Sequence, residues 1–211
     1  MARKAYAISL FLIVGSLSLS TVADAWARSQ VFPIAEAAPA LAPFQHVRFC
    51  LRYPADCKSD PAESPVIELN AETSELMNHI NHSVNAAIMP VFKKAAIELQ
   101  DGWTIAPTTG DCNDYAVTKR HELLQSGLPA KALRLAVVKT SSGIGHLVLV
   151  VATTKGDLVL DNLTEVIRPW QSTDYHWLKI QSASDARYWY DIKLPVVALS
   201  HFDREFRLAG R

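Results

Sequence analysis

Apolar residues in the middle of the chain recur with the spacing of a helix. Between residues 70 and 90 they occupy every fourth position, at Leu76, Ile80, Val84 and Ile88. Asn70 or Thr73 can cap the start of this segment, and Pro90 stops it. The pattern therefore predicts an amphipathic helix that ends before the proline.

Two histidines of this segment could share a metal ion. His79 and His82 are three residues apart, which suits two ligands on one side of a helix. They flank the apolar stripe among Asn78, Asn81 and Asn85. We therefore expect a solvated or hydrogen-bonded polar face at these histidines.

A second helix is predicted to begin at Cys112. Cys112, Ala116 and Leu123 fall on one stripe. Gly127 can close the helix, and Pro129 prevents its continuation. In the first turn, unpaired backbone N–H groups and the positive end of the helix dipole favour a thiolate over a thiol. An isolated cysteine can equally be a small buried apolar residue, and position alone does not decide between the two.

The stretch between these helices is less regular. Residues 91–100 could form a further short helix before an Asp-Gly-Trp turn at 101–103. A loop from Trp103 to Gly110 then leads to Cys112. Trp103 is either a core aromatic or a neighbour of the site around the cysteine.

Beyond Pro129 the apolar pattern changes to alternation. Four or five strands in a row are predicted, from segments at residues 133–137, 147–152, 158–160, 177–180 and 188–192. Helices come first and strands later, and short turns join the strands. This order predicts an α+β domain over residues 66–211, with N-terminal helices packed on an antiparallel sheet.

The start of the chain has the pattern of an export signal. Arg3 and Lys4 precede the almost entirely apolar or small residues 5–22, and residues 25–27 read Ala-Trp-Ala, as a signal peptidase requires. We expect residues 1–27 to be a cleaved signal peptide, and an uncleaved membrane anchor is the alternative. Either reading places the rest of the chain outside the cytoplasm, and after cleavage no segment is expected to insert into a membrane.

Two of the three cysteines lie close together in the sequence. Cys50 and Cys57 bracket six residues that include Pro54, which can form the turn of a small loop. In an oxidising compartment this spacing predicts a disulfide, whereas a zinc site would need two further ligands. Residues 28–65 are rich in alanine and proline, so we expect a loosely ordered leader that ends in this loop. Cys112 is left as the free thiol.

The net charge of the chain bears on the kind of substrate that it binds. The chain has 21 basic and 21 acidic residues and a formal net charge of zero. This balance does not suggest nucleic acid, and the sequence contains no basic amphipathic run that would suggest a lipid surface. The substrate must therefore be recognised by a local site.

Two polar residues occupy positions at which the strand pattern predicts apolar side chains. His146 opens the strand at 147–152, and Asp161 follows the strand at 158–160. A hairpin between the strands would put both side chains on one face. A two-residue loop at Lys155 and Gly156 places Asp161 across from Val150, about 13 Å along the strand from His146. We therefore expect a bulge or a wider loop to bring them together.

Cys112, His146 and Asp161 would then have complementary roles. The sulfur attacks a carbonyl carbon, the imidazole takes the thiol proton and later protonates the leaving amine, and the carboxylate orients the imidazole. The Cys112 N–H and a further donor would form an oxyanion hole. Gly143 and Gly145 would let the backbone approach the cleft closely.

The motifs around these residues resemble those of the bacterial transglutaminase-like cysteine proteinases. They are Gly-Asp-Cys-Asn-Asp-Tyr-Ala at 110–116, Gly-His-Leu-Val-Leu at 145–149 and Leu-Asp-Asn at 160–162, within a match over residues 81–182. The resemblance implies a papain-like or transglutaminase-like core, a triad of Cys112, His146 and Asp161, and a periplasmic location. It also implies a large surface adhesin as substrate, a role in biofilm release, and control by an inner-membrane receptor for a cyclic dinucleotide.

The resemblance further implies a calcium ion held by acidic residues near the cysteine, which correspond to Asp111 and Asp114. Many relatives have glutamate after the cysteine, where this chain has Asn113. Losing a carboxylate weakens a site for a hard cation. Asp111 as an N-cap and Asp114 three residues later are also what a helix start prefers without any ion.

Three functions are compatible with these residues. The first is a periplasmic cysteine endopeptidase. The second is an amidase or acyl transferase that acts on cell-wall peptide or glutamine, since the same triad serves all these reactions. The third is a catalytically idle binding protein with the same fold.

Overall fold

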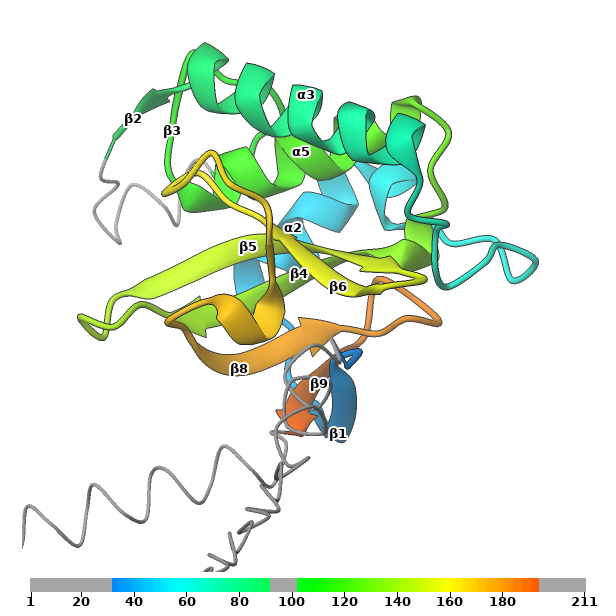
Figure 1. The fold of residues 1–211 in the computed structure, drawn as a ribbon. Helices are drawn as coiled ribbons and strands as arrows, with labels where there is room; N and C mark the ends of the chain where they lie inside the picture. Colours follow the sequence, from blue (N-terminus) through cyan, green and yellow to red (C-terminus); the bar gives the residue numbers. More distant parts are fainter. Residues whose placement is uncertain (1–31, 92–101, 194–211) are drawn as a thin grey trace, which may run out of the picture. The chain divides into compact units, whose positions relative to one another are not determined.

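Helices cover one face of a seven-stranded sheet in the computed structural model of the chain, which describes residues 32–91 and 102–193 (Figure 1). The sheet order is β1-β9-β8-β4-β5-β6-β7, and every neighbouring pair is antiparallel. The α+β prediction with an antiparallel sheet is confirmed.

The described strands include all five that alternation predicts. The predicted ones are β4 (Leu133–Lys139), β5 (Gly145–Thr153), β6 (Gly156–Leu160), β8 (His176–Gln181) and β9 (Trp189–Lys193). The two edge strands of the sheet were not predicted, β1 (Ala35–Ala40) and the two-residue β7 (Arg168–Pro169). A separate parallel pair joins β2 (Met89–Pro90) to β3 (Thr109–Gly110).

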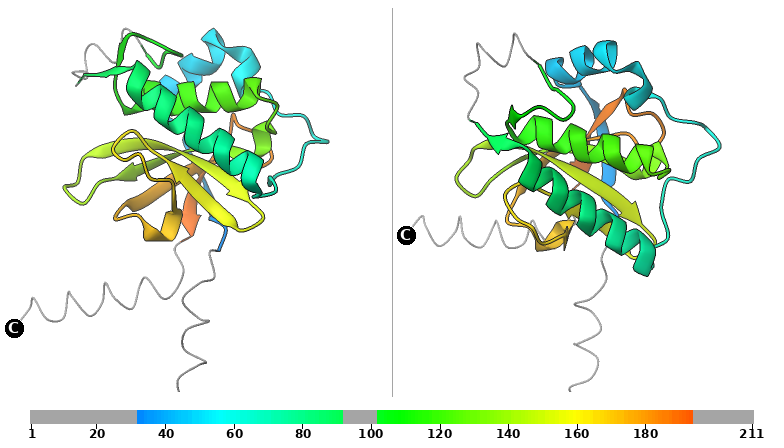
Figure 2. Two further views of the ribbon diagram at one scale, coloured as in Figure 1. Left: turned by 45° about the horizontal axis from the view of Figure 1, so that its top comes forward. Right: turned by 90° about the horizontal axis from the view of Figure 1, so that it is seen from above.

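Helix α3 (Ala71–Ala87) confirms the prediction from four-residue spacing. The Asn70 side chain caps it by accepting the Thr73 N–H, and the Thr73 hydroxyl completes a capping box by accepting the Asn70 N–H. Its buried apolar side chains are Met77, Ile80 and Val84. Figure 2 shows α3 running beside α5 (Cys112–Gln125) over the sheet. The helical layer therefore holds the start of α5 against the middle of the sheet.

Strand β5, which lies between β4 and β6, is buried on both faces. Leu147, Leu149 and Val151 belong to the apolar cluster that includes α3 and α5. Val148 and Val150 point the other way, into a second cluster built around Trp170 and Trp177. Burial on both faces explains why β5 reads as a continuous apolar run.

The predicted loosely ordered leader is wrong for much of residues 28–65. This stretch forms β1, helix α2 (Phe44–Arg52) and the short 3₁₀ helix η1 (Pro54–Cys57). Strand β1 pairs with β9 through an irregular register around Pro39, as an edge strand with proline must. Helix α2 buries Gln45, His46 and Phe49, so two of its three buried side chains are polar.

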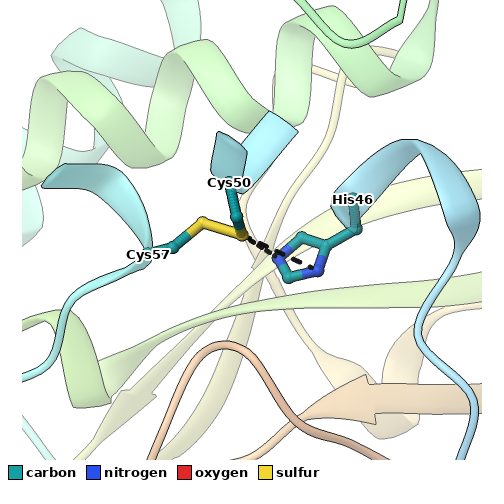
Figure 3. Close-up of side chains that lie close together, drawn as sticks. All are labelled: His46, Cys50 and Cys57. Carbon is teal, nitrogen blue, oxygen red and sulfur yellow. Dashed lines mark hydrogen bonds between the residues drawn. A yellow bond between two sulfur atoms is a disulfide. The ribbon is translucent and has the colours of Figure 1, made fainter. Parts of the chain in front are cut away.

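The Cys50–Cys57 disulfide is present and ties the end of α2 to η1, which confirms the prediction (Figure 3). His46 lies beside it, with Nε2 3.4 Å from the Cys50 sulfur. Among the described residues, His46, Cys50 and Cys57 form the only group of three or more side chains close enough together to hold a metal ion. Because the sulfurs are bonded to each other, they offer no thiolate to a zinc ion.

Several sequence expectations concern other parts of the chain. The signal peptide at residues 1–27 and the short helix at 91–100 lie outside the described residues, the latter except for Val91. His79 and His82 are exposed, as expected, and His82 Nδ1 lies 2.8 Å from Glu165 Oε2. Among the described helices, none has both the length and the apolar content needed to cross a bilayer.

Candidate active site

Cys112 is the first residue of helix α5. Asp111 is the N-cap, and its Oδ1 accepts the Asn113 N–H at 3.0 Å. Asp114 returns a hydrogen bond by accepting the Asp111 N–H at 3.0 Å. This capping box fixes the first turn, and it leaves Cys112 as a partly exposed free thiol at the positive end of the helix.

The backbone before the cysteine is held closely against this turn. Thr104 N donates to the second oxygen of Asp114 at 2.9 Å, which fastens the preceding loop to the helix. A Cβ at Gly110 would lie 2.8 Å from the Asp114 side chain. Gly110 is therefore needed because a larger residue would push the loop off the helix start.

His146 and Asp161 meet without the bulge that we expected between β5 and β6. Thr154 and Lys155 form the two-residue loop, and Gly156 with φ of 101° already pairs with Thr153. The loop thus lies one residue earlier than predicted, and the register moves by two. Leu160 pairs with Leu149, so Asp161 follows at the level of Val148 and not Val150. His146 Nε2 lies 2.8 Å from Asp161 Oδ1.

Further hydrogen bonds fix the Asp161 carboxylate. The Tyr175 hydroxyl donates to Oδ2, and the Leu163 N–H donates to Oδ1 at 3.0 Å. The Asn85 side chain, from α3, donates to the Asp161 backbone carbonyl at 3.1 Å. The carboxylate therefore has little freedom to turn away from the imidazole.

Asp161 and Cys112, the two partners of His146, determine the protonation state of its imidazole. Burial alone lowers the pKa of His146, but the hydrogen bonds to Asp161 and Cys112 and their negative charges outweigh it and raise the pKa to about 9. For Asp161, burial raises the pKa, and the contacts with His146 and Tyr175 more than offset this and lower it. At neutral pH the site holds an imidazolium against an ionised carboxylate. Because Nε2 faces Asp161, Nδ1 is the ring nitrogen available to the thiol.

These residues open onto a cleft of about 1210 Å³. Cys112 and His146 line it, together with Trp103 and Gly145. Trp103 is only 4% exposed, so it is both a core aromatic and a wall of the cleft. Gly143 lies in the β4–β5 turn with a φ of 80°, which favours glycine. At Gly145 a Cβ would meet no atom within 4 Å.

Apolar side chains form much of the rim of this cleft. Exposed apolar residues that line it are Phe44, Val91, Ile144 and Leu163. Among the described residues, the charged side chains in the lining are Asp111, His146 and Lys179. The cleft is thus suited to a mostly uncharged segment of a substrate.

The two carboxylates predicted to hold calcium have structural roles. Asp114 is fully buried, and each of its oxygens accepts a backbone N–H. Asp111 caps α5. Calcium needs six to eight oxygen ligands, and in the described part of the chain no third acidic side chain joins these two. These two carboxylates therefore do not fit a calcium site.

Sequence reasoning missed several residues that contact the Asp161 region. Tyr175 and Asn85 come from segments distant in sequence, and no motif marks Tyr175. The spacing of Asn81 and Asn85, four residues apart on α3, could have indicated a shared polar contact. Both side chains donate hydrogen bonds to backbone carbonyls just after β6. Lys119, fully buried in α5, was also missed. Burial lowers its pKa to about 7, against the opposing charges of Asp161 and Glu165.

The sequence signature of the bacterial transglutaminase-like cysteine proteinases matches residues 36–195. The chain belongs to this family. The match includes β1 and α2, so these elements are part of the proteinase's own sequence pattern. Among curated proteins, none matches the chain.

Solved structures of LapG from Legionella pneumophila are similar to the proteinase. The calcium-bound form is 22% identical, with a TM-score of 0.47 over 56% of this chain and 68% of LapG. A second LapG structure is 20% identical, with a TM-score of 0.45 over 68% and 77% of the two chains. An EGTA-treated form is 18% identical, with a TM-score of 0.45 over 73% and 81%.

Proposed function

We propose that the protein is an endopeptidase that hydrolyses a peptide bond through an acyl-thioenzyme on Cys112. One observation carries this proposal: the buried imidazole of His146 is held between the Asp161 carboxylate and the Cys112 thiol, at the wall of a large cleft. An imidazolium beside a thiol at a helix N-terminus favours the nucleophilic thiolate.

The reaction follows from the positions of these groups. The sulfur bonds to the carbonyl carbon, and the carbonyl electron pair moves to the oxygen. When the tetrahedral adduct collapses, the C–N bond breaks and His146 gives its proton to the leaving amine. Water then attacks the thioester with His146 as base, and the acid product leaves. Asp161 keeps the imidazole oriented throughout.

The cellular setting is part of the same proposal. The signal-like residues 1–27 and the Cys50–Cys57 disulfide support export to an oxidising compartment, which we take to be the periplasm. Family membership supports a protein substrate, and we propose a large surface adhesin whose cleavage releases biofilm cells. Control by an inner-membrane receptor for a cyclic dinucleotide is the corresponding regulatory proposal.

A comparison of new protein N-termini tests the proposal. Cells that produce the native protein are compared with cells that produce Cys112→Ala, and the released surface proteins are sequenced from their N-termini. We expect one or a few cleavage sites that need Cys112. Incorporation of a dansylated amine into proteins, without cleavage, would identify an acyl transferase instead. Iodoacetamide labelling of Cys112 no faster than that of a free thiol would indicate an idle binding protein.

A further inference from the structure

A buried side-chain amide without a partner lies in the wall of the cleft that holds Cys112. Gln45, the second residue of α2, is only 8% exposed and lines this cleft. Among the described residues, neither its Oε1 nor its Nε2 has a hydrogen-bond partner. Buried amides are nearly always satisfied, so an unpaired one in a cleft wall indicates a partner that arrives with a ligand.

The surroundings of Gln45 connect it to the start of α5. The amide oxygen lies 3.3 Å from the position that a Cβ would occupy at Gly102. Gly102 is followed by Trp103, which lines the cleft, and by Thr104, whose N–H is bonded to Asp114 in the first turn of α5. The amide thus stands against the short loop that is fastened to the helix turn carrying the nucleophile.

A second buried donor lies in the same wall. Trp103 Nε1 also has no acceptor among the described residues, and the ring is 4% exposed. Two N–H donors without acceptors therefore line a cleft whose nucleophile creates negative charge on an oxygen. Hydrogen bonds to an oxyanion need donors that are fixed in advance and not satisfied by the protein itself.

We propose that the Gln45 side-chain N–H donates to the oxyanion of the tetrahedral adduct on Cys112. This inference rests on the proposed function. When the thiolate bonds to the carbonyl carbon, the C=O π electrons move to oxygen, and the Gln45 amide stabilises that charge together with the Cys112 N–H. As the adduct collapses, the electron pair returns to the carbonyl and the leaving group departs. Gln45 is therefore a catalytic residue that the sequence motifs around Cys112 do not include.

The test compares two reactions of the same sulfur. p-Nitrophenyl acetate acylates a thiolate through a tetrahedral oxyanion, whereas iodoacetamide alkylates it by direct displacement, without one. We measure the nitrophenolate burst and the alkylation rate for the native protein and for Gln45→Leu, which keeps the size of the side chain but removes the donor. Gln45→Glu is a second variant of similar size, Cys112→Ala gives the background, and Gln125→Leu at the far end of α5 is the matched control.

We expect Gln45→Leu to acylate at least tenfold more slowly, because one oxyanion donor contributes about 100-fold or more in hydrolases. Alkylation should change by less than about twofold, because that reaction creates no oxyanion. The midpoint of thermal unfolding should be no lower than that of the native protein, because the substitution removes an unsatisfied buried amide. A group with only a structural role would not give this combination.

Other outcomes separate the possible failures. An unchanged burst in Gln45→Leu, with a Cys112-dependent burst in the native protein, overturns the inference and leaves the proposed function intact. If Trp103→Phe loses the burst and Gln45→Leu does not, the donor is the indole and the assignment to Gln45 is wrong. A parallel fall of acylation and alkylation in both Gln45 variants would show that Gln45 only supports the fold. Absence of any Cys112-dependent burst in the native protein overturns the proposed function, and this inference with it.

Discussion

His46 and His146 are both buried, at 1% and 6% exposure, and yet their proton affinities shift in opposite directions. Burial lowers the pKa of His46 to about 4, with a further contribution from the positive charge of Arg120. The pKa of His146 rises to about 9 although burial opposes it. Removal from water is common to both residues and therefore does not decide the difference.

The partners of each ring explain the contrast. Trp189 Nε1 donates to His46 Nδ1 at 3.1 Å, and the uncharged Gln181 amide and the Cys50 sulfur lie against Nε2. None of these partners is an anion, so His46 remains a neutral core residue. His146 has a carboxylate on one nitrogen and the thiol as its other partner. The neighbours of His146 thus keep its imidazole protonated at neutral pH, as the proposed mechanism requires.

Asp161→Asn should break this contrast most severely. Without the carboxylate the imidazolium loses its main stabilising partner, and the amide cannot hold the ring in the same protonation state. We expect kcat/KM for peptide cleavage to fall by about 10³-fold to 10⁴-fold. Steady-state kinetics on the cleaved peptide measure the effect. Asp185→Asn, which breaks the surface pair with Arg187, is the matched control and should leave kcat/KM within about twofold.

The pH profile gives a second readout of the same substitution. With its pKa near 9, His146 carries the proton for the leaving amine up to about that pH, and activity should fall above it. Because the folded pKa is above the ordinary value of 6.5, the stability that this pair adds is complete below 6.5 and is lost as pH rises through 9. In Asp161→Asn the alkaline limit should move to lower pH. An unmoved limit would mean that another group donates the proton.

His46→Gln tests the other histidine of the comparison, and it should change how the free energy of unfolding depends on pH. The folded protein resists protonating His46 until about pH 4, whereas the unfolded chain takes up the proton near 6.5. In the native protein this difference lowers the free energy of unfolding by up to about 3 kcal/mol as pH falls from 6.5 to 4. The variant should lack that part of the decline. Urea unfolding at pH 4.5 and 7.5 measures it.

The control for His46→Gln is His79→Gln, on the exposed face of α3. This surface substitution should change the free energy of unfolding by less than about 0.5 kcal/mol. Equal declines in all three proteins would show that His46 is not the group responsible.

Tyr175→Phe should have a smaller effect on the His146 pair. It removes one hydrogen bond to Asp161 and keeps the ring, whose centroid lies 5.6 Å from that of His146. One hydrogen bond to a charged group contributes about 1.5–3 kcal/mol, so we expect kcat/KM to fall by about 10-fold to 100-fold. Tyr188→Phe, at an exposed tyrosine, is the control. A full loss of activity would mean that Tyr175 does more than hold the carboxylate.

Calcium removal should have the smallest effect. Both oxygens of Asp114 already accept backbone N–H groups, and Asn113 brings no charge. We expect EGTA and 1 mM calcium to give unfolding midpoints within about 1 °C of each other, since a ligand that does not bind the folded state cannot stabilise it. A rise of several degrees with calcium, abolished in Asp111→Asn, would establish the ion that the family resemblance implies.

Local signals predicted most of the fold. The spacing in α3, the capping residues at Asn70 and Asp111, and the alternation in β4 and β8 all act within a few residues, so sequence alone reveals them. Helix α2 was not predicted. Two of the side chains that it buries, Gln45 and His46, are polar, and their partners come from β8 and β9 or are absent among the described residues. Its burial depends on contacts distant in sequence.

The sequence predicted which residues form the candidate site, but it did not predict how the fold brings them together. Cys112, His146 and Asp161 stood out as polar groups at the ends of apolar elements. Their meeting depended on whether the hairpin loop began at Thr154 or at Lys155, and composition does not distinguish these choices. Tyr175 and Gln45 are invisible locally, because a tyrosine or glutamine acquires such a role only when folding brings it to the cleft.

The two-residue loop between β5 and β6 restricts how this protein can be altered. One inserted residue after Thr154 would shift the pairing so that the Asp161 side chain faced the opposite side of the sheet. A solvent-facing turn remote from the nucleophile is therefore a poor place for an epitope tag or a fluorescent label. The β4–β5 turn is no better a position, because Ser142 lines the cleft that holds Cys112.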